Sequence, residues 1–281
     1  MKYCLPYNSI TSKSQQIIEL DEWTIDYNPS DKTLIKFLEN NSNKRINLKI
    51  KDKLSIKKTE DLKFLEDLCE KFQNLYIEFD IFIRNQYQEL LDSNIRYFFD
   101  DYITDWDRLN EIIDFKVSDV YIAETLGFEL DKVSTFAHNA GVRIRVFPNV
   151  AQCSTEYTND LKKFFIRPED LDIYESYVDV YEFYGDSNKL LTYYQIYRYD
   201  KKWFGPLKDL IIGFNDEIDN KYIIPRFPER RIKCGKKCLK GASCSMCETI
   251  EQLSKTLDNA KIVIQIDKDK NNDIMNNEGE D

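Results

Sequence analysis

The chain has 281 residues, of which 42% are hydrophobic and 32% charged, and its net charge is −10 at neutral pH. This composition is typical of a soluble globular protein, and the length suits one barrel of roughly 250 residues. The sequence contains no run of ~20 apolar residues that could cross a membrane and no apolar core of a secretory signal. We therefore expect a cytoplasmic protein without a membrane partner.

Short β-rich runs alternate with segments of helical pattern from near the start to beyond residue 210. The predicted strands are Thr24–Tyr27, Ile46–Ile50, Leu75–Asp80, Ile95–Asp100, Ser118–Ala123, Val142–Phe147, Phe164–Arg167 and Val178–Phe183. The predicted helices are Lys32–Glu39, Thr59–Phe72, Arg84–Leu91, Trp106–Ile113, Leu130–Asn139, Asn159–Lys163 and Asp170–Tyr177, followed by a long amphipathic segment at Leu190–Phe214.

This alternation predicts an α/β fold, because parallel strands are joined through crossover helices. Eight units favour a (β/α)8 TIM-like barrel, with a doubly wound open sheet as the alternative. We expect the barrel to span residues 1–225, a cysteine-rich extension with a helix and a strand to span 226–266, and a disordered acidic tail to span 267–281.

Four cysteines lie close together near the end of the chain, at Cys234, Cys238, Cys244 and Cys247. Their spacing, with Gly235 and Gly241 between them, allows the thiols to close around one metal centre. Thiolates suit zinc or an iron–sulfur cluster, and the spacing leaves both open. The lysines nearby would lower the thiol pKa values and offset the charge of a tetrathiolate. We expect these four cysteines to be metal ligands.

Chemistry in such barrels collects at the carboxyl ends of the strands. Arg167, between Ile166 and Pro168, is the strongest candidate there, since an arginine suits a carboxylate or phosphate ligand or could pair with Glu182. Glu78 and Asp80 share one face of their strand and could hold a metal or act as acid and base. The other polar residues placed there are Asp26, Lys49, Asp100, Asp101, Glu124, Asn149, Gln152, Glu169 and Glu182.

The sequence gives little support to several common chemistries. It has no GxGxxG after the first strand and no GxxxxGK[ST], so classical dinucleotide and P-loop sites are absent. His138, the only histidine, falls late in a predicted helix, where it more often interacts with the helix C-terminus than catalyses. Histidine-based zinc hydrolysis and Ser-His-Asp catalysis are therefore disfavoured.

Residues 118–198 resemble the peptidase U32 (collagenase-like) family. The resemblance lies in three segments, in the order in which they occur in that family. Ser118–Gly127 is similar to the family's strand that ends in a Leu-Gly turn, and Phe164–Leu171 is similar to its apolar strand followed by Arg-Glu-Leu. Val180–Gly185 is similar to its Glu-Val-Phe segment with a Gly two residues on. Tyr184 stands where the peptidase-like members have histidine, and no cysteine follows before Cys234. The resemblance implies a barrel, in several members an iron–sulfur cluster, and hydroxylation of ubiquinone precursors or RNA without oxygen.

Two main hypotheses follow. In the first, the protein is a U32-like iron–sulfur enzyme of the hydroxylation or RNA-modification type, with Arg167 and Glu182 lining a pocket for an RNA or a small molecule. In the second, the barrel is not catalytic, zinc holds the extension, and the basic stretch 226–240 binds nucleic acid or a protein partner. A carboxylate-based metal-dependent hydrolase or lyase is a third alternative.

Overall fold

The structure is a computed structural model of the whole chain. It describes residues 2–6, 20–28, 32–50, 59–80, 93–123, 126–152, 160–184, 198–199, 201, 205–220, 223, 227–234, 246–250, 252–253 and 255–256. Among the predictions from sequence, the helix Arg84–Leu91, Glu124, Cys153, Cys238, Cys244 and the tail 267–281 lie outside these residues.

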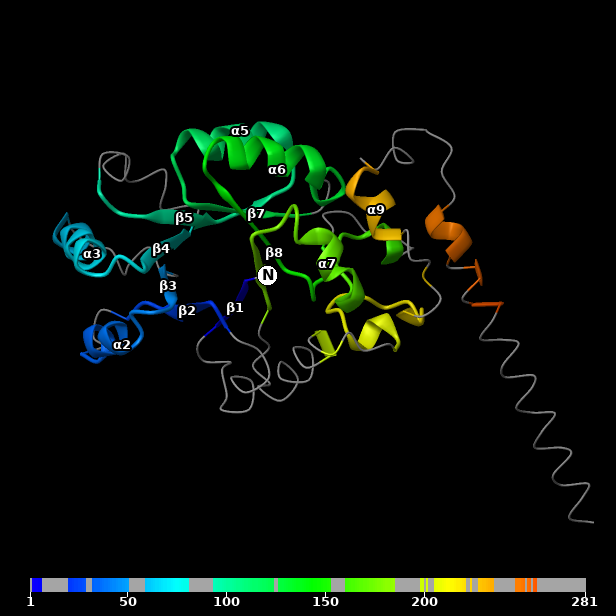
Figure 1. Cartoon of the computed structure of the whole chain (residues 1–281), viewed down its shortest axis with the longest axis horizontal. Helices are drawn as coiled ribbons and strands as arrows, with labels where there is room; N and C mark the ends of the chain where they lie inside the picture. The colour runs from blue at the N-terminus through cyan, green and yellow to red at the C-terminus, as the bar shows by residue number, and fades with distance from the viewer. Residues whose placement is uncertain are drawn as a thin grey trace, which may run out of the picture.

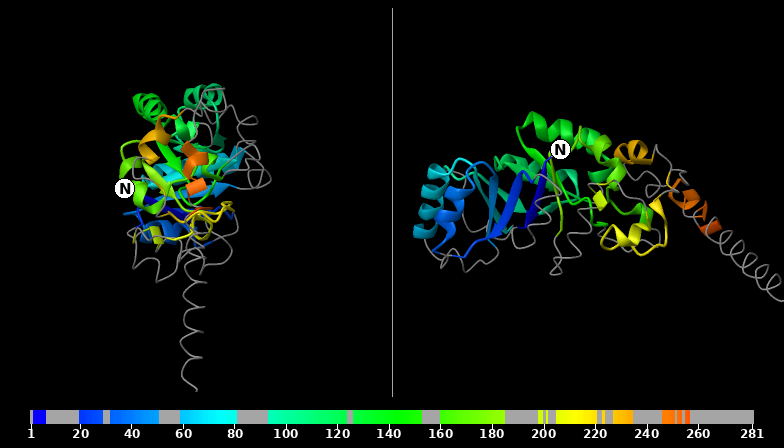
Figure 2. Two further views of the ribbon diagram at one scale, coloured as in Figure 1. Left: turned by 90° about the vertical axis from the view of Figure 1, so that its right-hand side faces the viewer. Right: turned by 60° about the horizontal axis from the view of Figure 1, so that its bottom comes forward.

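The described strands form one parallel sheet that curls into a nearly closed barrel (Figures 1 and 2). Its order is β5-β4-β3-β2-β1-β9-β8-β7-β6, so neighbours in the sheet follow one another in the chain except for β1 and β9, the first and last strands, which pair with each other. The strands are β1 (Tyr3–Pro6), β2 (Glu22–Asp26), β3 (Arg45–Ile50), β4 (Leu75–Asp80), β5 (Tyr97–Asp100), β6 (Tyr102–Ile103), β7 (Asp119–Ile122), β8 (Arg143–Val146) and β9 (Val180–Glu182).

The two edges of the sheet meet because β5 and β6 are separated by one residue, Asp101. β5 pairs with β4, and β6 pairs with β7. In addition, the amide of Ser118, just before β7, donates to the carbonyl of Tyr97 in β5 at 2.8 Å. This continuous segment therefore bridges the edges, and the predicted α/β barrel class is confirmed over the open sheet.

Helices cover the outside of the barrel. They are α2 (Leu34–Asn40), α3 (Thr59–Lys71), α5 (Trp106–Asp114), α6 (Leu130–Asn139), α7 (Leu171–Tyr174) and α9 (Phe227–Ile232). Helices α5 and α6 lie side by side (Figure 1), with Trp106 and Phe136 in edge-to-face contact at 5.9 Å. None of the described helices combines the length and the apolar composition that crossing a bilayer requires.

Local signals fix the ends of two helices. Asp105 caps α5 by accepting a hydrogen bond from the amide of Arg108 at 2.9 Å. Gly141 has φ +75° directly after α6, which is the left-handed conformation that ends a helix. His138 lies in the last turn of α6, where its Nε2 is 2.8 Å from Asp179 Oδ2.

The structure departs from the predicted elements in three places. The barrel begins at β1, which the sequence pattern misses because this strand has only four residues and ends in proline. Phe164–Arg167 is not a barrel strand: Phe164 forms an isolated antiparallel bridge with Gln152, and a 3-10 turn begins at Pro168. Within the described part of Leu190–Phe214, Arg198 and Tyr199 are helical, whereas residues 205–214 contain only a 3-10 turn, Leu207–Asp209, after Pro206.

A second, smaller hydrophobic core lies beside the barrel. Its buried residues come from three separate stretches of the chain: Leu161, Phe165, Leu207, Leu210, Ile211, Phe214, Ile218, Ile223, Phe227 and Ile250. Arg231 in α9 joins this core to the main core of the barrel, because its buried guanidinium donates to the carbonyl of Phe165 at 3.3 Å and lies 4.9 Å from the ring of Phe128 in the main core. The second core therefore includes residues on both sides of the expected border at 225.

Candidate active site at the carboxyl end of the barrel

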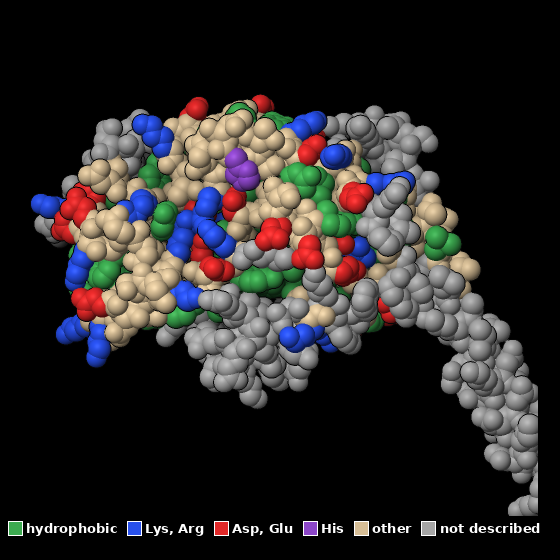
Figure 3. Space-filling view, viewed as in Figure 1, with side chains coloured by type: hydrophobic (Ala, Val, Ile, Leu, Met, Phe, Trp, Pro, Cys, Tyr) green, Lys and Arg blue, Asp and Glu red, His purple; other side chains and the backbone are tan. Residues whose placement is uncertain are grey.

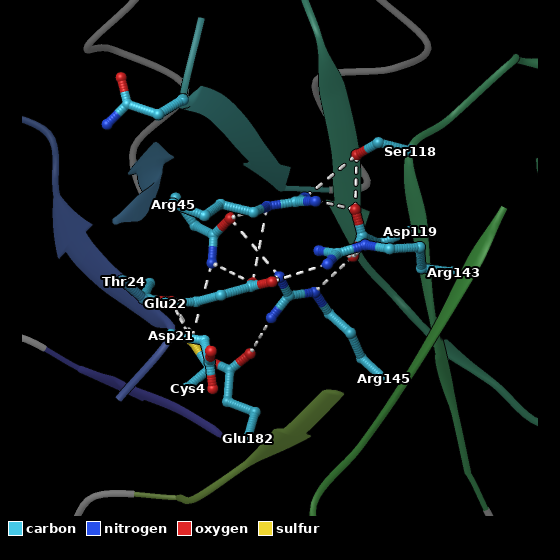
Figure 4. Close-up of polar contacts among 12 residues, drawn as sticks. Cys4, Asp21, Glu22, Thr24, Arg45, Ser118, Asp119, Arg143, Arg145 and Glu182 are labelled. Carbon is cyan, nitrogen blue, oxygen red and sulfur yellow. Dashed lines mark hydrogen bonds and ion pairs between the residues drawn. The ribbon is translucent and has the colours of Figure 1, made fainter. Parts of the chain in front are cut away.

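The inside of the barrel is lined by charged side chains. Strand alternation directs every second residue inward, so Arg143 and Arg145 both enter from β8 while Ile144 packs outside. Three arginines there meet three carboxylates; we call this set the arginine network: Arg45, Arg143, Arg145, Glu22, Asp119 and Glu182. Figure 4 shows these side chains converging from strands that lie around the barrel.

Arg145 is the centre of the arginine network and is fully buried. Its Nε donates to Asp119 Oδ1 at 2.9 Å and its Nη1 to Glu182 Oε2 at 3.0 Å, and it also pairs with Glu22. Arg143 pairs with two of these carboxylates: its Nη1 lies 2.7 Å from Glu22 Oε1, and its Nη2 lies 2.7 Å from Asp119 Oδ1. A buried charge needs such partners, because an unpaired one would be strongly destabilising.

The arginines keep their partners ionised. Burial raises the pKa of Glu22, but Arg145, Arg45 and Arg143 outweigh it and lower that pKa to about 2. The pKa of Asp119 is likewise held far below its usual range, because the same three guanidinium groups overcome its burial. Glu22 and Asp119 are therefore ionised throughout the physiological pH range.

A second charged group lies nearer the carboxyl ends of the strands; we call Lys49, Glu78 and Asp100 the lysine cluster. The ammonium of Lys49 in β3 lies 2.6 Å from Glu78 Oε1 in β4 and 2.7 Å from Asp100 Oδ2 in β5. The Lys49 and Asp100 side chains are 23% and 28% exposed, whereas that of Glu78 is 0% exposed. Solvent therefore reaches the cluster through Lys49 and Asp100, with Glu78 beneath them.

Within the lysine cluster, Glu78 is the group whose pKa lies near neutral pH. Burial raises the pKa of this carboxyl most strongly, Lys49 opposes that effect, and the net pKa is about 7. Burial lowers the pKa of Lys49, but Glu78 and Asp100 more than compensate and raise it above its usual value. At neutral pH the lysine is charged while Glu78 can either hold or release a proton.

An aromatic wall, made of Tyr102, Tyr121, Phe147 and Tyr184, lies next to these charges. The rings of Tyr121 and Phe147 stack with centroids 5.3 Å apart, and Tyr102 packs against Phe147 at 5.8 Å. Tyr102 and Tyr184 remain 45% and 52% exposed. Burial raises the pKa of Tyr102, and Asp100 and Glu182 add to that rise.

The structure separates the two residues expected to be catalytic. Glu182 lies at the end of β9 inside the barrel, where it accepts hydrogen bonds from Tyr121 at 2.8 Å and from Arg145. Arg167 is buried elsewhere, with Nε 2.6 Å and Nη2 2.7 Å from the carboxylate of Asp170 and Nη1 3.1 Å from Asn220 Oδ1. The suggested pairing of Arg167 with Glu182 is thus replaced by pairing with Asp170.

The cysteine site is described only in part. Cys234 follows α9, and its amide donates to the carbonyl of Arg231 at 3.0 Å. Cys247 lies 3.7 Å from the carbonyl of Leu161 at the second core. Burial lowers the pKa of the Arg231 guanidinium, while Tyr174 and Cys247 act in the opposite direction. Among the described residues, no three His, Cys, Asp or Glu side chains are arranged so that they could hold a metal ion.

Charges of both signs mix on the face drawn in Figure 3, where basic side chains lie next to acidic ones close to the histidine. Sequence reasoning placed Lys49, Glu78, Asp100 and Glu182 at strand ends but did not identify Arg145, Tyr102 or Tyr121. The alternation in Arg143-Ile144-Arg145 was a usable signal, because two charges on the same side of a strand suggest a polar interior.

The chain matches no protein-family model, no curated protein and no solved structure. The resemblance to the peptidase U32 family thus remains a prediction from the residues quoted for it.

Proposed function

We propose that the protein is a barrel enzyme that transfers protons at the carboxyl end of its barrel, with Glu78 as the acid–base group and Lys49 as a fixed cation. The observation that carries this proposal is the pairing of a fully buried glutamate with a lysine at 2.6 Å, at the end of the barrel where such enzymes work. A carboxyl with a pKa of about 7 suits proton transfer near neutral pH.

The reaction that fits these two groups is removal of a proton from a carbon next to a carbonyl. The proton passes to a Glu78 carboxylate oxygen, the electron pair of the C–H bond forms a C=C bond, and the carbonyl π pair moves onto oxygen. Lys49 has three N–H donors, two of which point to Glu78 and Asp100. The third can stabilise the oxyanion before Glu78 returns the proton.

Solvent exchange tests this reaction without knowledge of the natural product. The protein would be incubated in D2O with a panel of oxo acids, keto sugars and amino ketones, and proton NMR would follow the loss of signals next to each carbonyl. Exchange that exceeds the uncatalysed rate and falls at least 100-fold in Glu78→Gln supports the proposal. Glu39→Gln, an exposed glutamate on α2, is the matched control. Exchange that is equal in the wild type and Glu78→Gln contradicts it.

We also propose that Cys234, Cys238, Cys244 and Cys247 bind one metal centre, either iron–sulfur or zinc. The support is the sequence spacing, together with the interaction of Cys247 with the buried guanidinium of Arg231 and the hydrogen bond from the amide of Cys234 to the carbonyl of the same residue. A positive charge there would offset the negative charge of thiolates.

Metal and sulfide analysis of protein purified without oxygen tests this second proposal. Iron with sulfide and a brown colour would support the U32-like redox enzyme acting on an RNA or small molecule. One zinc per chain would support a structural zinc site in an extension that binds nucleic acid or a protein partner. Metal content unchanged in a Cys234→Ser, Cys247→Ser variant would contradict both versions.

A further inference from the structure

The two charged groups inside the barrel differ in their balance of charge. In the arginine network, three guanidinium groups face three carboxylates, so the sum is zero. In the lysine cluster, the ammonium of Lys49 faces the carboxyl groups of Glu78 and Asp100, so the cluster carries one excess negative charge whenever Glu78 is ionised. Among the described residues, the lysine cluster thus has room for one additional positive charge.

One atom of the lysine cluster also lacks a hydrogen bond. Glu78 Oε1 is engaged by Lys49, but Glu78 Oε2 is buried and has no hydrogen-bond partner in the described part of the chain. A buried carboxylate oxygen without a donor destabilises the fold, because it has lost its hydrogen bonds to water and gained none in return. A ligand that brings a charged N–H donor to this atom would supply both the missing hydrogen bond and the missing charge.

The aromatic wall provides a surface for the rest of such a ligand. Tyr102 and Tyr184 flank Phe147, with ring centroids 5.8 Å and 6.3 Å from it, and these two tyrosines are the exposed members of the wall. Aromatic faces attract ammonium groups as well as apolar chains. The amide of Tyr184 donates to Asn149 Oδ1 at 3.1 Å, which holds this segment against the end of β8.

We infer that the carboxyl end of the barrel binds a primary amine with an apolar or aromatic body, the ammonium meeting Glu78 and the body lying against Tyr102 and Tyr184. This inference rests on the proposed function and specifies the class of its substrate. An anion is a poor fit, because it would face the carboxylates of Glu78 and Asp100. A neutral molecule would leave the excess charge uncompensated.

Three small probes of equal size and different charge test the inference. Titration calorimetry at pH 8 would compare 2-phenylethylamine, 2-phenylethanol and phenylacetate on the full-length protein. We expect the amine to bind at least 10-fold more tightly than the alcohol and the acid to bind most weakly. Glu78→Gln should reduce amine affinity at least 10-fold, whereas Glu39→Gln should leave it unchanged. Tyr102→Leu should weaken the amine and the alcohol by similar factors.

Proton release gives a second readout that does not depend on a variant. Amine binding requires ionised Glu78, which is faced by Lys49 from β3, Asp100 from β5 and Glu182 from β9. The affinity should therefore fall about 10-fold per pH unit below pH 7, with proton release detected in buffers of different ionisation enthalpy. Equal affinities for the three probes, or no binding of the amine, would overturn the inference. If solvent exchange still depends on Glu78, the proposed reaction survives that failure.

Discussion

The arginine network and the lysine cluster lie in the same barrel but satisfy their charges to different degrees. Each of the three guanidinium nitrogens of Arg145 has a carboxylate partner, and both Glu22 and Asp119 accept hydrogen bonds from two or more arginines. Glu78 has one bound oxygen and one that lacks a described partner. Complete pairing indicates a structural role, and incomplete pairing marks the place where a ligand can act.

The pKa values follow the same division. The arginine network stabilises ionised carboxylates and lowers the pKa of Glu22 to about 2. In the lysine cluster, the pKa of Glu78 stays raised, at about 7. One cation between two carboxylates cannot fully overcome burial, whereas three cations among three carboxylates can. A group such as Glu78, whose burial is not fully offset by nearby cations, lowers the stability of the fold when it is charged, as groups in reactive sites often do.

The largest effect should come from removing the centre of the arginine network. Arg145→Met keeps much of the side-chain volume but leaves Glu22, Asp119 and Glu182 short of a buried cation. We expect a loss of about 3–5 kcal/mol in the free energy of unfolding, because uncompensated buried charges remain. Urea denaturation at pH 7 measures it. A loss below about 1 kcal/mol would show that the arginine network does not stabilise the fold.

The pH dependence of stability should separate the two groups. Glu78 has a raised pKa in the folded state, so its contribution is fully present below about pH 4.5 and is lost as pH rises through about 7. The loss is on the order of 3 kcal/mol, at about 1.4 kcal/mol for each unit of pKa shift. Urea denaturation between pH 5 and 8 should show this slope in the wild type and in Glu39→Gln but not in Glu78→Gln.

Glu22 should show the opposite dependence. Its folded-state pKa lies below its usual value, so its contribution is present above about pH 4.5 and is lost as pH falls toward 2. We expect the wild type to lose on the order of 3 kcal/mol more than Glu22→Gln over this acidic range. Stability measured at pH 5, 4 and 3 would reveal it. Parallel curves for the two proteins would mean that the arginines do not hold Glu22 ionised.

The fold was more accessible to sequence reasoning than the site. Hydrophobic periodicity and caps are local, which is why Leu130–Asn139 was predicted with its actual bounds and Gly141 as its end. The charged partners are distant in sequence: Arg145 is 123 residues from Glu22. Spacing alone cannot show which strand ends meet across a barrel. Arg167 looked reactive at an apparent strand end, but its partner, Asp170, is only three residues away.

The smallest effect should come from an ion pair outside the barrel. Lys71 in α3 lies 3.0 Å from Glu39 near the end of α2, and both side chains are about half exposed, at 55% and 52%. Lys71→Met should lower the free energy of unfolding by less than about 1 kcal/mol, because solvent screens the pair, and added salt should remove the difference. The same urea measurement used for Arg145→Met applies. A loss as large as that of Arg145→Met would show that burial is not what makes the arginine network important, since the distances in the two sites are similar.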